Sequence, residues 1–232
     1  MGNHLASLSI VLPAYNEEAV IADTVRHVIT QGEKYGCAFE IIVVNDGSRD
    51  NTPRIVEDLC THDARIRVVH HNINKGYGEA LRSGFATATK EWIFLMDADG
   101  QFDMTNLEEF FPHTDTHDML LGYREKRADT PLRVLLGWGY TTCMNVLFAM
   151  RFKDIDCAFK LFRRSAWKAV QPITSTDHKI FSTEWLWKSA QRKLRIKELP
   201  IPHYPRRAGV STGAKPDIIW EMFKALIKLR FR

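Results

Sequence analysis

The segment Trp92-Ile93-Phe94-Leu95-Met96-Asp97-Ala98-Asp99-Gly100-Gln101 places two carboxylates at the end of a short apolar run. The run has the length of a buried strand, and a carboxylate is costly to bury without a partner, so we expect a cation where the strand ends. Side chains at i and i+2 of an extended chain point the same way, so Asp97 and Asp99 can face one ion while Gly100 turns the backbone. Such oxygen ligands suit a hard divalent ion with open positions for phosphate oxygens. A polar turn after a strand is the alternative.

Composition bounds the class of protein. The 232 residues can bury one sizeable core, and 32 Lys and Arg against 28 Asp and Glu give a net charge of only +4, so bulk charge does not indicate a nucleic-acid-binding protein. The N-terminus lacks the features of a signal peptide, so we expect a cytoplasmic start. Four scattered cysteines form neither a metal motif nor a disulfide framework, which suits a reducing compartment; they are Cys37, Cys60, Cys143 and Cys157.

Strand-like and helix-like segments alternate along the first half of the chain. This alternation predicts an α/β fold with a mostly parallel sheet, helices on both faces and a binding site beyond the carboxyl ends of the strands. Strands are expected at residues 8–12, 40–45, 66–69, 92–96 and 119–121, and helices at 19–35, from 52 onward, and at 76–87.

Two motifs at strand ends suit a nucleoside. In Pro13-Ala14-Tyr15-Asn16-Glu17, Pro13 stiffens the exit, Tyr15 offers a flat ring for a base, and Glu17 can accept from ribose hydroxyls. In Asn45-Asp46-Gly47-Ser48, Asp46 can accept from the imino N–H of uracil or guanine. A turn followed by a helix cap is the alternative for both motifs. We favour binding for Asp46 because three strand ends converge on one edge.

The segment Asn74-Lys75-Gly76 precedes the third expected helix. Lys75 and Gly76 at a helix N-terminus can approach phosphates, although the spacing is neither a Walker A pattern nor a dinucleotide fingerprint. The position agrees with a nucleoside diphosphate extending from Asp46 to the pair Asp97 and Asp99.

These motifs, in this order, resemble the inverting family 2 glycosyltransferases of the GT-A (Rossmann-like) fold, and most of all the branch of dolichyl-phosphate mannose synthase and other polyprenyl-phosphate glycosyltransferases. The resemblance implies that Asp97, Asp99 and Gln101 form a metal site for Mg²⁺ or Mn²⁺. It also implies that the nucleotide sugar is bound by Pro13, Tyr15, Asn16, Glu17, Asp46, Ser48, Lys75, Gly76, Asp97, Ala98, Asp99 and Gln101.

The second half of the chain carries the resemblance to the branch. Gly122-Tyr123-Arg124 and Arg206-Arg207-Ala208-Gly209-Val210-Ser211 resemble elements whose residues Arg124, Arg206 and Ser211 would contact the diphosphate. The segment from Asp154 to Arg164 resembles the acceptor region. Lys160 stands there where arginine is typical, which puts a bidentate phosphate contact in doubt.

The implied activity is transfer of a mannose- or glucose-type hexose from a GDP- or UDP-sugar to a polyprenyl phosphate, with inversion. Asp99 would serve catalysis through the metal. The phosphate acceptor is already anionic, so little is required of a base. Asp154 and Glu184 are the candidates for a base or acceptor-orienting carboxylate, and a structural cap is the alternative for both. The rival functions are transfer to a soluble or polysaccharide acceptor and an inactive nucleotide-sugar-binding subunit.

We expect a glycosyltransferase domain at residues 1–212, divided into a nucleotide-sugar half (1–123) and an acceptor half (124–212), followed by an amphipathic helix at 213–232. The uncharged segment 134–150 is expected to lie at a membrane interface or pack on the sheet, with Trp138, Tyr140 and Phe148 as membrane-facing aromatics. These features predict peripheral association with the cytoplasmic face of a membrane and no nucleic-acid partner. A membrane-protein partner and a homo-oligomer both remain open.

Overall fold

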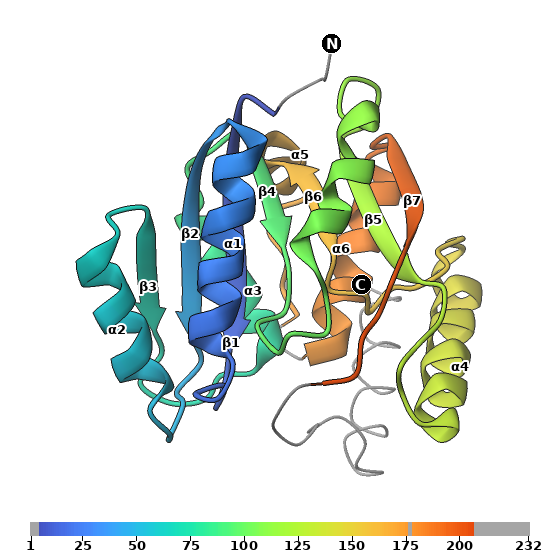
Figure 1. The fold of residues 1–232 in the computed structure, drawn as a ribbon. Coiled ribbons are helices and arrows are strands. Elements are labelled where there is room, and N and C mark those ends of the chain that lie inside the picture. The colour runs from blue at the N-terminus through green and yellow to red at the C-terminus, as the bar shows by residue number, and fades with distance from the viewer. Residues whose placement is uncertain (1–4, 176–177, 207–232) are drawn as a thin grey trace.

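The structure, a computed structural model, describes residues 5–175 and 178–206. A seven-stranded sheet with the strand order β3-β2-β1-β4-β6-β5-β7 forms the centre of the molecule (Figure 1). The strands are β1 (Ser7–Ala14), β2 (Ala38–Asn45), β3 (Ile66–His70), β4 (Trp92–Leu95), β5 (Met119–Arg124), β6 (Lys160–Arg163) and β7 (Ile196–Ile201). The helices are α1 (Ile21–Tyr35), α2 (Thr52–His62), α3 (Tyr77–Thr87), α4 (Pro131–Phe148), α5 (Arg164–Ala169) and α6 (His178–Gln191), with 3₁₀ turns η1 (Met104–Glu109) and η2 (Phe111–His113).

The predicted α/β class is confirmed, and the five expected strands correspond to β1–β5. Two further strands, β6 and β7, were not expected. β6 is antiparallel to both of its neighbours and is only four residues long, with a basic residue at each end. Among the strands that the structure describes, β7 pairs with β5 alone and lies at the edge of the sheet, and its polar residues hide the apolar pattern of a buried strand. The predicted helix at 213–232 lies outside the described residues.

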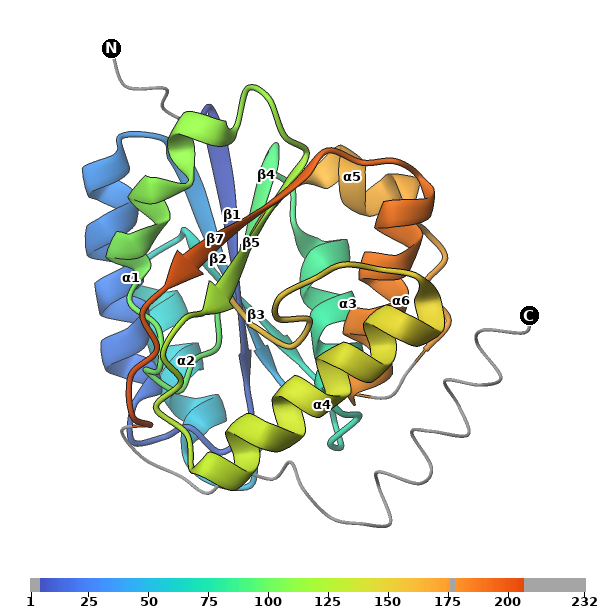
Figure 2. The ribbon, with the colours of Figure 1, turned by 90° about the vertical axis from the view of Figure 1, so that its right-hand side faces the viewer.

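Two hydrophobic clusters occupy the two faces of the sheet. On one face, α1 contributes Ile21, Val25 and Val28, whose spacing of four and three residues aligns them on one side of the helix. On the other face, α3, α5 and α6 pack through aromatic residues such as Phe85 and Trp185. Figure 2 shows α1 and α2 on one side of the sheet and α3, α5 and α6 on the other. The sheet is therefore buried on both faces.

The topology brings one end of each of the seven strands to one edge of the sheet. All strands except β6 run in the same direction, so the carboxyl ends of β1, β2, β3, β4, β5 and β7 share this edge. Because β6 runs the other way, its first residue, Lys160, also lies there, paired with Leu95 and Leu121. The predicted motifs follow these strand ends, and we call this side of the molecule the carboxyl edge.

Candidate functional site

Asp97 and Asp99 follow β4 at the carboxyl edge, as predicted. Gly100 adopts a left-handed conformation with φ of +74°, and the backbone N–H of Gln101 donates to Asp99 Oδ1 over 3.0 Å. The hydroxyl of Tyr77 donates to Asp97 Oδ1 over 2.8 Å. Asp99 is almost completely buried. A hydrogen bond within the turn therefore holds Asp99, and a hydrogen bond from the start of α3 holds Asp97.

The two carboxylates repel each other and attract a cation. Burial raises the pKa of Asp97, the charge of Asp99 raises it further, and the hydrogen bond from Tyr77 and the charge of Arg206 oppose this. The Arg206 guanidinium lies beside Asp99, with 2.8 Å between Nη2 and Oδ2, and its Nη1 is 3.6 Å from Glu17 Oε1. Without Arg206, the site would therefore have too little positive charge to balance its carboxylates.

Glu17, which follows β1, has one carboxylate oxygen that is fully buried. Its Oε2 atom has no hydrogen-bond partner among the described residues. Burial raises the pKa of Glu17 to about 7, Arg206 acts in the opposite direction, and the charge of Asp99 adds to the rise. A buried acceptor in this state can take a hydrogen bond from a ligand hydroxyl.

Asp46 is enclosed by hydrogen-bond donors. The backbone N–H groups of Lys75 and Gly76 donate to Oδ1 and Oδ2, each over 2.9 Å, and Nδ1 of His71 donates to Oδ1 over 2.6 Å. These two backbone groups, expected to meet phosphates, are thus directed at Asp46. Recognition of a base by Asp46 stays a prediction. The other ring nitrogen of His71, Nε2, lies 2.9 Å from the hydroxyl of Ser83.

Loops after β1 and β2 are tied together next to Glu17. The backbone N–H of Asn16 donates to Ser48 Oγ over 3.0 Å, and that of Arg49 donates to Asn16 Oδ1 over 2.8 Å. Asn16 has a left-handed φ of +56°, which asparagine tolerates better than most residues. Pro13 is buried within β1, and Tyr15 is partly buried beyond its end. The structure thus brings the first two predicted motifs into one assembly.

Arg124 and Asp154 form a buried ion pair at the end of β5. Nε and Nη2 of Arg124 donate to the two oxygens of Asp154 over 2.7 and 2.8 Å. Burial alone would raise the pKa of Asp154, but the hydrogen bonds and charge of Arg124 outweigh it and the pKa is lowered. Asp154 is therefore an ionised partner of Arg124, in a state that suits positioning better than proton abstraction.

Lys160 is buried behind this pair. Its Nζ donates to the carbonyl oxygens of Ile155 and Cys157, and burial lowers its pKa. The ammonium group thus holds the loop that carries Asp154.

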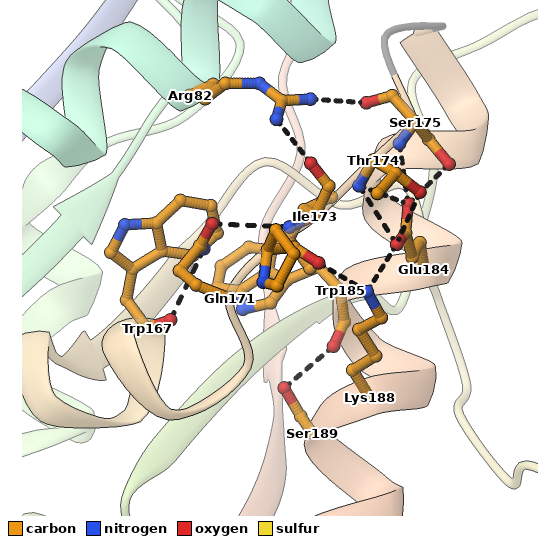
Figure 3. Close-up of polar contacts among 11 residues, drawn as sticks. Arg82, Trp167, Gln171, Ile173, Thr174, Ser175, Glu184, Trp185, Lys188 and Ser189 are labelled. Carbon is orange, nitrogen blue, oxygen red and sulfur yellow. Dashed lines mark hydrogen bonds and ion pairs between the residues drawn. The ribbon is translucent and has the colours of Figure 1, made fainter.

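Glu184 on α6 has both oxygens occupied (Figure 3). The backbone N–H groups and hydroxyls of Thr174 and Ser175 donate to it over 2.5 to 3.2 Å, and Lys188 Nζ lies 2.6 Å from Oε1. Burial would raise the pKa of Glu184, but these contacts lower it. Arg82 on α3 donates to the carbonyls of Ile173 and Ser175 in the same loop. The contacts match the structural alternative for Glu184.

Gln101 connects the segments that follow β4 and β7 by two hydrogen bonds. Its backbone carbonyl accepts from Tyr204 N over 2.9 Å, and its Nε2 donates to the carbonyl of Tyr204 over 3.2 Å. A role as third metal ligand stays a prediction.

The carbonyl of Ala98 accepts a hydrogen bond from Thr24 Oγ1 over 3.0 Å. Ser211 lies outside the described residues. Within the described ranges, no group of three or more His, Cys, Asp or Glu side chains is arranged to hold a metal ion.

Several curated proteins are similar in sequence. Glycosyltransferase AglD of Haloferax volcanii is 32% identical over 207 residues, which cover 86% of this chain and 33% of that protein. Dolichyl-phosphate beta-glucosyltransferase of Saccharomyces cerevisiae is 29% identical, covering 84% of this chain and 66% of that protein. Dodecaprenyl-phosphate galacturonate synthase of Rhizobium johnstonii is 28% identical, covering 88% and 61%. The chain spans from one third to just under two thirds of the length of these relatives.

The fold is also that of solved structures. Glucosyl-3-phosphoglycerate synthase from Mycobacterium tuberculosis, in complex with Mn²⁺, uridine diphosphate and glucosyl-3-phosphoglycerate, matches with a TM-score of 0.71 at 18% identity, covering 95% of this chain and 77% of that chain. At this identity the match shows the fold alone, and it confirms the expected GT-A arrangement.

The sequence profile described as Glycosyl transferase family 2 matches residues 9–170, which is more than half of the chain. This range contains the carboxylates after β4, the Asp46 assembly and the Arg124–Asp154 pair. The chain therefore belongs to glycosyltransferase family 2.

Proposed function

We propose that this chain transfers a hexose from a nucleoside diphosphate sugar to a polyprenyl phosphate, with inversion at the anomeric carbon. The names of the similar yeast and Rhizobium proteins, which refer to dolichyl and dodecaprenyl phosphate, support this acceptor class. One observation carries the donor half of the proposal: Glu17, Asp97, Asp99 and Arg206 converge at the carboxyl edge although they follow three different strands.

Asp97 and Asp99 fit a divalent metal that is shared with the substrate. Two neighbouring carboxylates, one with a raised pKa, favour a cation, and two protein ligands leave positions for diphosphate oxygens. Mg²⁺ or Mn²⁺ would supply positive charge to the departing diphosphate. The solved synthase from M. tuberculosis was obtained with Mn²⁺ and uridine diphosphate, which supports the same pairing here. Gln101 is the proposed third ligand.

The remaining donor contacts come from side chains of the carboxyl edge. Glu17 Oε2, buried and without a partner among the described residues, would accept from a ribose hydroxyl. Asp46 would accept from the imino group of uracil or guanine while still holding the turn at Gly76. Arg206 would exchange its contact with Asp99 for one with the diphosphate, Lys75 would add positive charge there, and Ser211 would donate a hydrogen bond to it.

The acceptor would lie at the Arg124–Asp154 pair. A polyprenyl phosphate is largely ionised at neutral pH, with a second pKa of about 6, so its oxygen can attack without a general base. Asp154 would orient Arg124, whose charge would help to neutralise the diphosphate of the donor beside the acceptor. We assign Glu184 a structural function, because its contacts with the 173–175 loop occupy both oxygens.

An apolar face on α4 supports a membrane surface as partner. Leu132, Leu135, Leu136 and Val146 are 64%, 61%, 43% and 79% exposed and follow the helical spacing of one side, and Trp138 beside them is 67% exposed. The opposite side packs on the core, so the expected membrane-facing role of Phe148 is wrong, since that side chain is buried. The Tyr140 hydroxyl lies 2.6 Å from Thr183 Oγ1.

In the described part of the chain, no helix has both the length and the hydrophobicity needed to cross a bilayer. We propose that the exposed face of α4 lies in the headgroup region of the membrane that contains the acceptor, on its cytoplasmic side. A membrane-protein partner or a second copy of the chain stays a prediction.

A transfer assay tests the proposal. UDP- and GDP-hexoses would be offered with short-chain polyprenyl phosphate, with a soluble sugar acceptor, and with no acceptor, each with Mg²⁺ or Mn²⁺. We expect metal-dependent transfer to the polyprenyl phosphate by the wild-type chain and none by Asp99→Ala. Transfer only to the soluble acceptor would overturn the lipid acceptor, and a wild-type chain that neither transfers nor hydrolyses any donor would overturn the enzymatic function.

A further inference from the structure

The three residues Lys75-Gly76-Tyr77 connect two parts of the site that the sequence motifs treat separately. The backbone N–H groups of Lys75 and Gly76 donate to the two oxygens of Asp46, each over 2.9 Å. The next residue, Tyr77, donates through its hydroxyl to Asp97 Oδ1 over 2.8 Å. One short turn therefore contacts both the carboxylate after β2 and the first carboxylate after β4.

The position of Tyr77 is set by rigid elements. Gly76 has φ of +89°, a conformation that favours glycine, and α3 begins at Tyr77 immediately after it. Further along α3, Gly84 lies so close to β1 that an added Cβ would approach Val11 Cγ1 within 2.4 Å. Val11 pairs with Leu95 at the end of β4. The helix that carries Tyr77 and the strand that leads to Asp97 are therefore both anchored on β1.

The hydroxyl of Tyr77 selects one oxygen of Asp97. A donor at Oδ1 fixes the orientation of the carboxylate and leaves Oδ2 for another ligand. Partners of this kind orient the residues that hold a metal ion, and their removal commonly weakens metal binding by about 10- to 100-fold. Tyr77 comes from a different element than either carboxylate, so a motif centred on β4 does not include it.

We infer that Tyr77 is a positioning residue for the metal site: it orients Asp97 through the hydrogen bond to Oδ1 and thereby raises the affinity for the divalent ion. The inference rests on the proposed metal site at Asp97 and Asp99. It does not depend on the identity of the acceptor.

The test is a titration of Mn²⁺ into the full chain, in the presence of UDP and separately of GDP, read by the loss of the free Mn²⁺ electron paramagnetic resonance signal. The variant is Tyr77→Phe, which removes only the hydroxyl. Tyr35→Phe is the matched control, because the Tyr35 hydroxyl also makes a buried hydrogen bond, to the carbonyl of Met104. Tyr35 is the last residue of α1, at the end of the helix away from the carboxyl edge. Thermal unfolding is recorded for all three proteins.

We expect Tyr77→Phe to weaken Mn²⁺ binding by about 10-fold or more while Tyr35→Phe binds like the wild type. An excess of Mn²⁺ should restore occupancy of the Tyr77→Phe site. Equal Mn²⁺ affinity in all three proteins would overturn the inference, and so would an equal loss in both variants, which would indicate general loosening.

The same titration separates this inference from the proposed function. If the wild type binds Mn²⁺ with nucleotide and Tyr77→Phe is weakened, but no sugar reaches polyprenyl phosphate, the acceptor assignment fails and the inference stands. If the wild type binds no Mn²⁺ with either nucleotide, the metal site and the inference are both overturned.

Discussion

The acidic side chains differ in what their oxygens already contact, and this difference separates binding groups from structural ones. Glu17 has a buried oxygen without a partner among the described residues, and its pKa is raised chiefly by burial. Glu184 has donors on both oxygens, and its pKa is lowered. A buried carboxylate with a raised pKa is a candidate to bind a cation or a substrate. A carboxylate that already has hydrogen-bond donors on both oxygens instead stabilises the fold.

Glu184→Gln tests this distinction. The glutamine amide has only one oxygen that can accept hydrogen bonds, and Lys188 loses its ion pair with Glu184. We therefore expect a loss of about 3 kcal/mol in the free energy of unfolding. The kcat of the folded fraction should stay within a few fold of wild type, with an unchanged pH profile. Urea denaturation and transfer kinetics on the same preparation measure both. A fall of kcat by two orders of magnitude at unchanged stability would instead identify Glu184 as a base.

Asp97 and Asp99 could be predicted from sequence because strand length and the i, i+2 rule are local. The role of Glu184 could not, because its donors lie on a loop whose backbone conformation is set by tertiary contacts with Arg82 and Lys188. Tyr77 was missed for a related reason: its partner is 20 residues away and on another element. Local patterns thus identify the proposed ligands more readily than the residues that contact them from other elements.

Secondary structure shows the same limit. β1–β5 carry apolar runs that are legible from sequence, whereas β6 begins with a lysine and becomes recognisable only when it pairs between β4 and β5. The hydropathy of α4 indicated an apolar helix but not which side is exposed. That depends on Met144 and Phe148 packing into the core, which leaves Leu135 and Val146 outside.

The exposed face of α4 predicts binding to vesicles. Replacing Leu135 and Leu136 together by serine should lower the affinity for anionic phospholipid vesicles by at least about 10-fold, because each leucine side chain that enters the bilayer contributes on the order of 1 kcal/mol or more. Ile73→Ser is the control, since Ile73 is 70% exposed and lies outside α4. Vesicle flotation measures the bound fraction. Equal binding of the wild type and the double variant would exclude this face as the membrane contact.

At the scale of the whole molecule, the carboxylates at the carboxyl ends of the strands differ in their contacts from Glu40, which lies nearer the amino ends. At the carboxyl edge the pKa values of Glu17 and Asp97 are raised, chiefly by burial, whereas Arg124 keeps the pKa of Asp154 low. Nearer the amino ends of the strands, Glu40 is saturated: Ser9 Oγ donates to its Oε1 over 2.6 Å, and Thr89 donates to the same oxygen through its backbone N–H and hydroxyl. Arg67 donates to Oε2 over 3.3 Å. The proposed binding site thus lies at one edge, whereas Glu40 at the other edge connects β1, β2 and β3 and the segment before β4.

Glu40 therefore predicts how stability changes with pH. Burial would raise its pKa, but the hydrogen bonds from Ser9, Thr89 and Arg67 outweigh this and lower it below the ordinary value of 4.5. A lowered folded-state pKa contributes stability above pH 4.5 that is lost as the pH falls through the folded-state value. Glu40→Gln should reduce the free energy of unfolding at pH 7 by about 2 kcal/mol.

Urea denaturation between pH 7 and pH 3 measures this effect, with Asp23→Asn as control. Asp23 pairs with Arg26 on the exposed side of α1, and a surface pair of this kind contributes less than about 1 kcal/mol. The difference between wild type and Glu40→Gln should shrink as the pH falls below 4.5 and through the folded-state pKa, because the unfolded wild-type chain takes up a proton at Glu40 before the folded one does. Transfer activity should be unchanged, since Glu40 lies away from the carboxyl edge. A difference that stays constant down to pH 3 would show that the lost contacts, and not the charge, carry the stability of this edge.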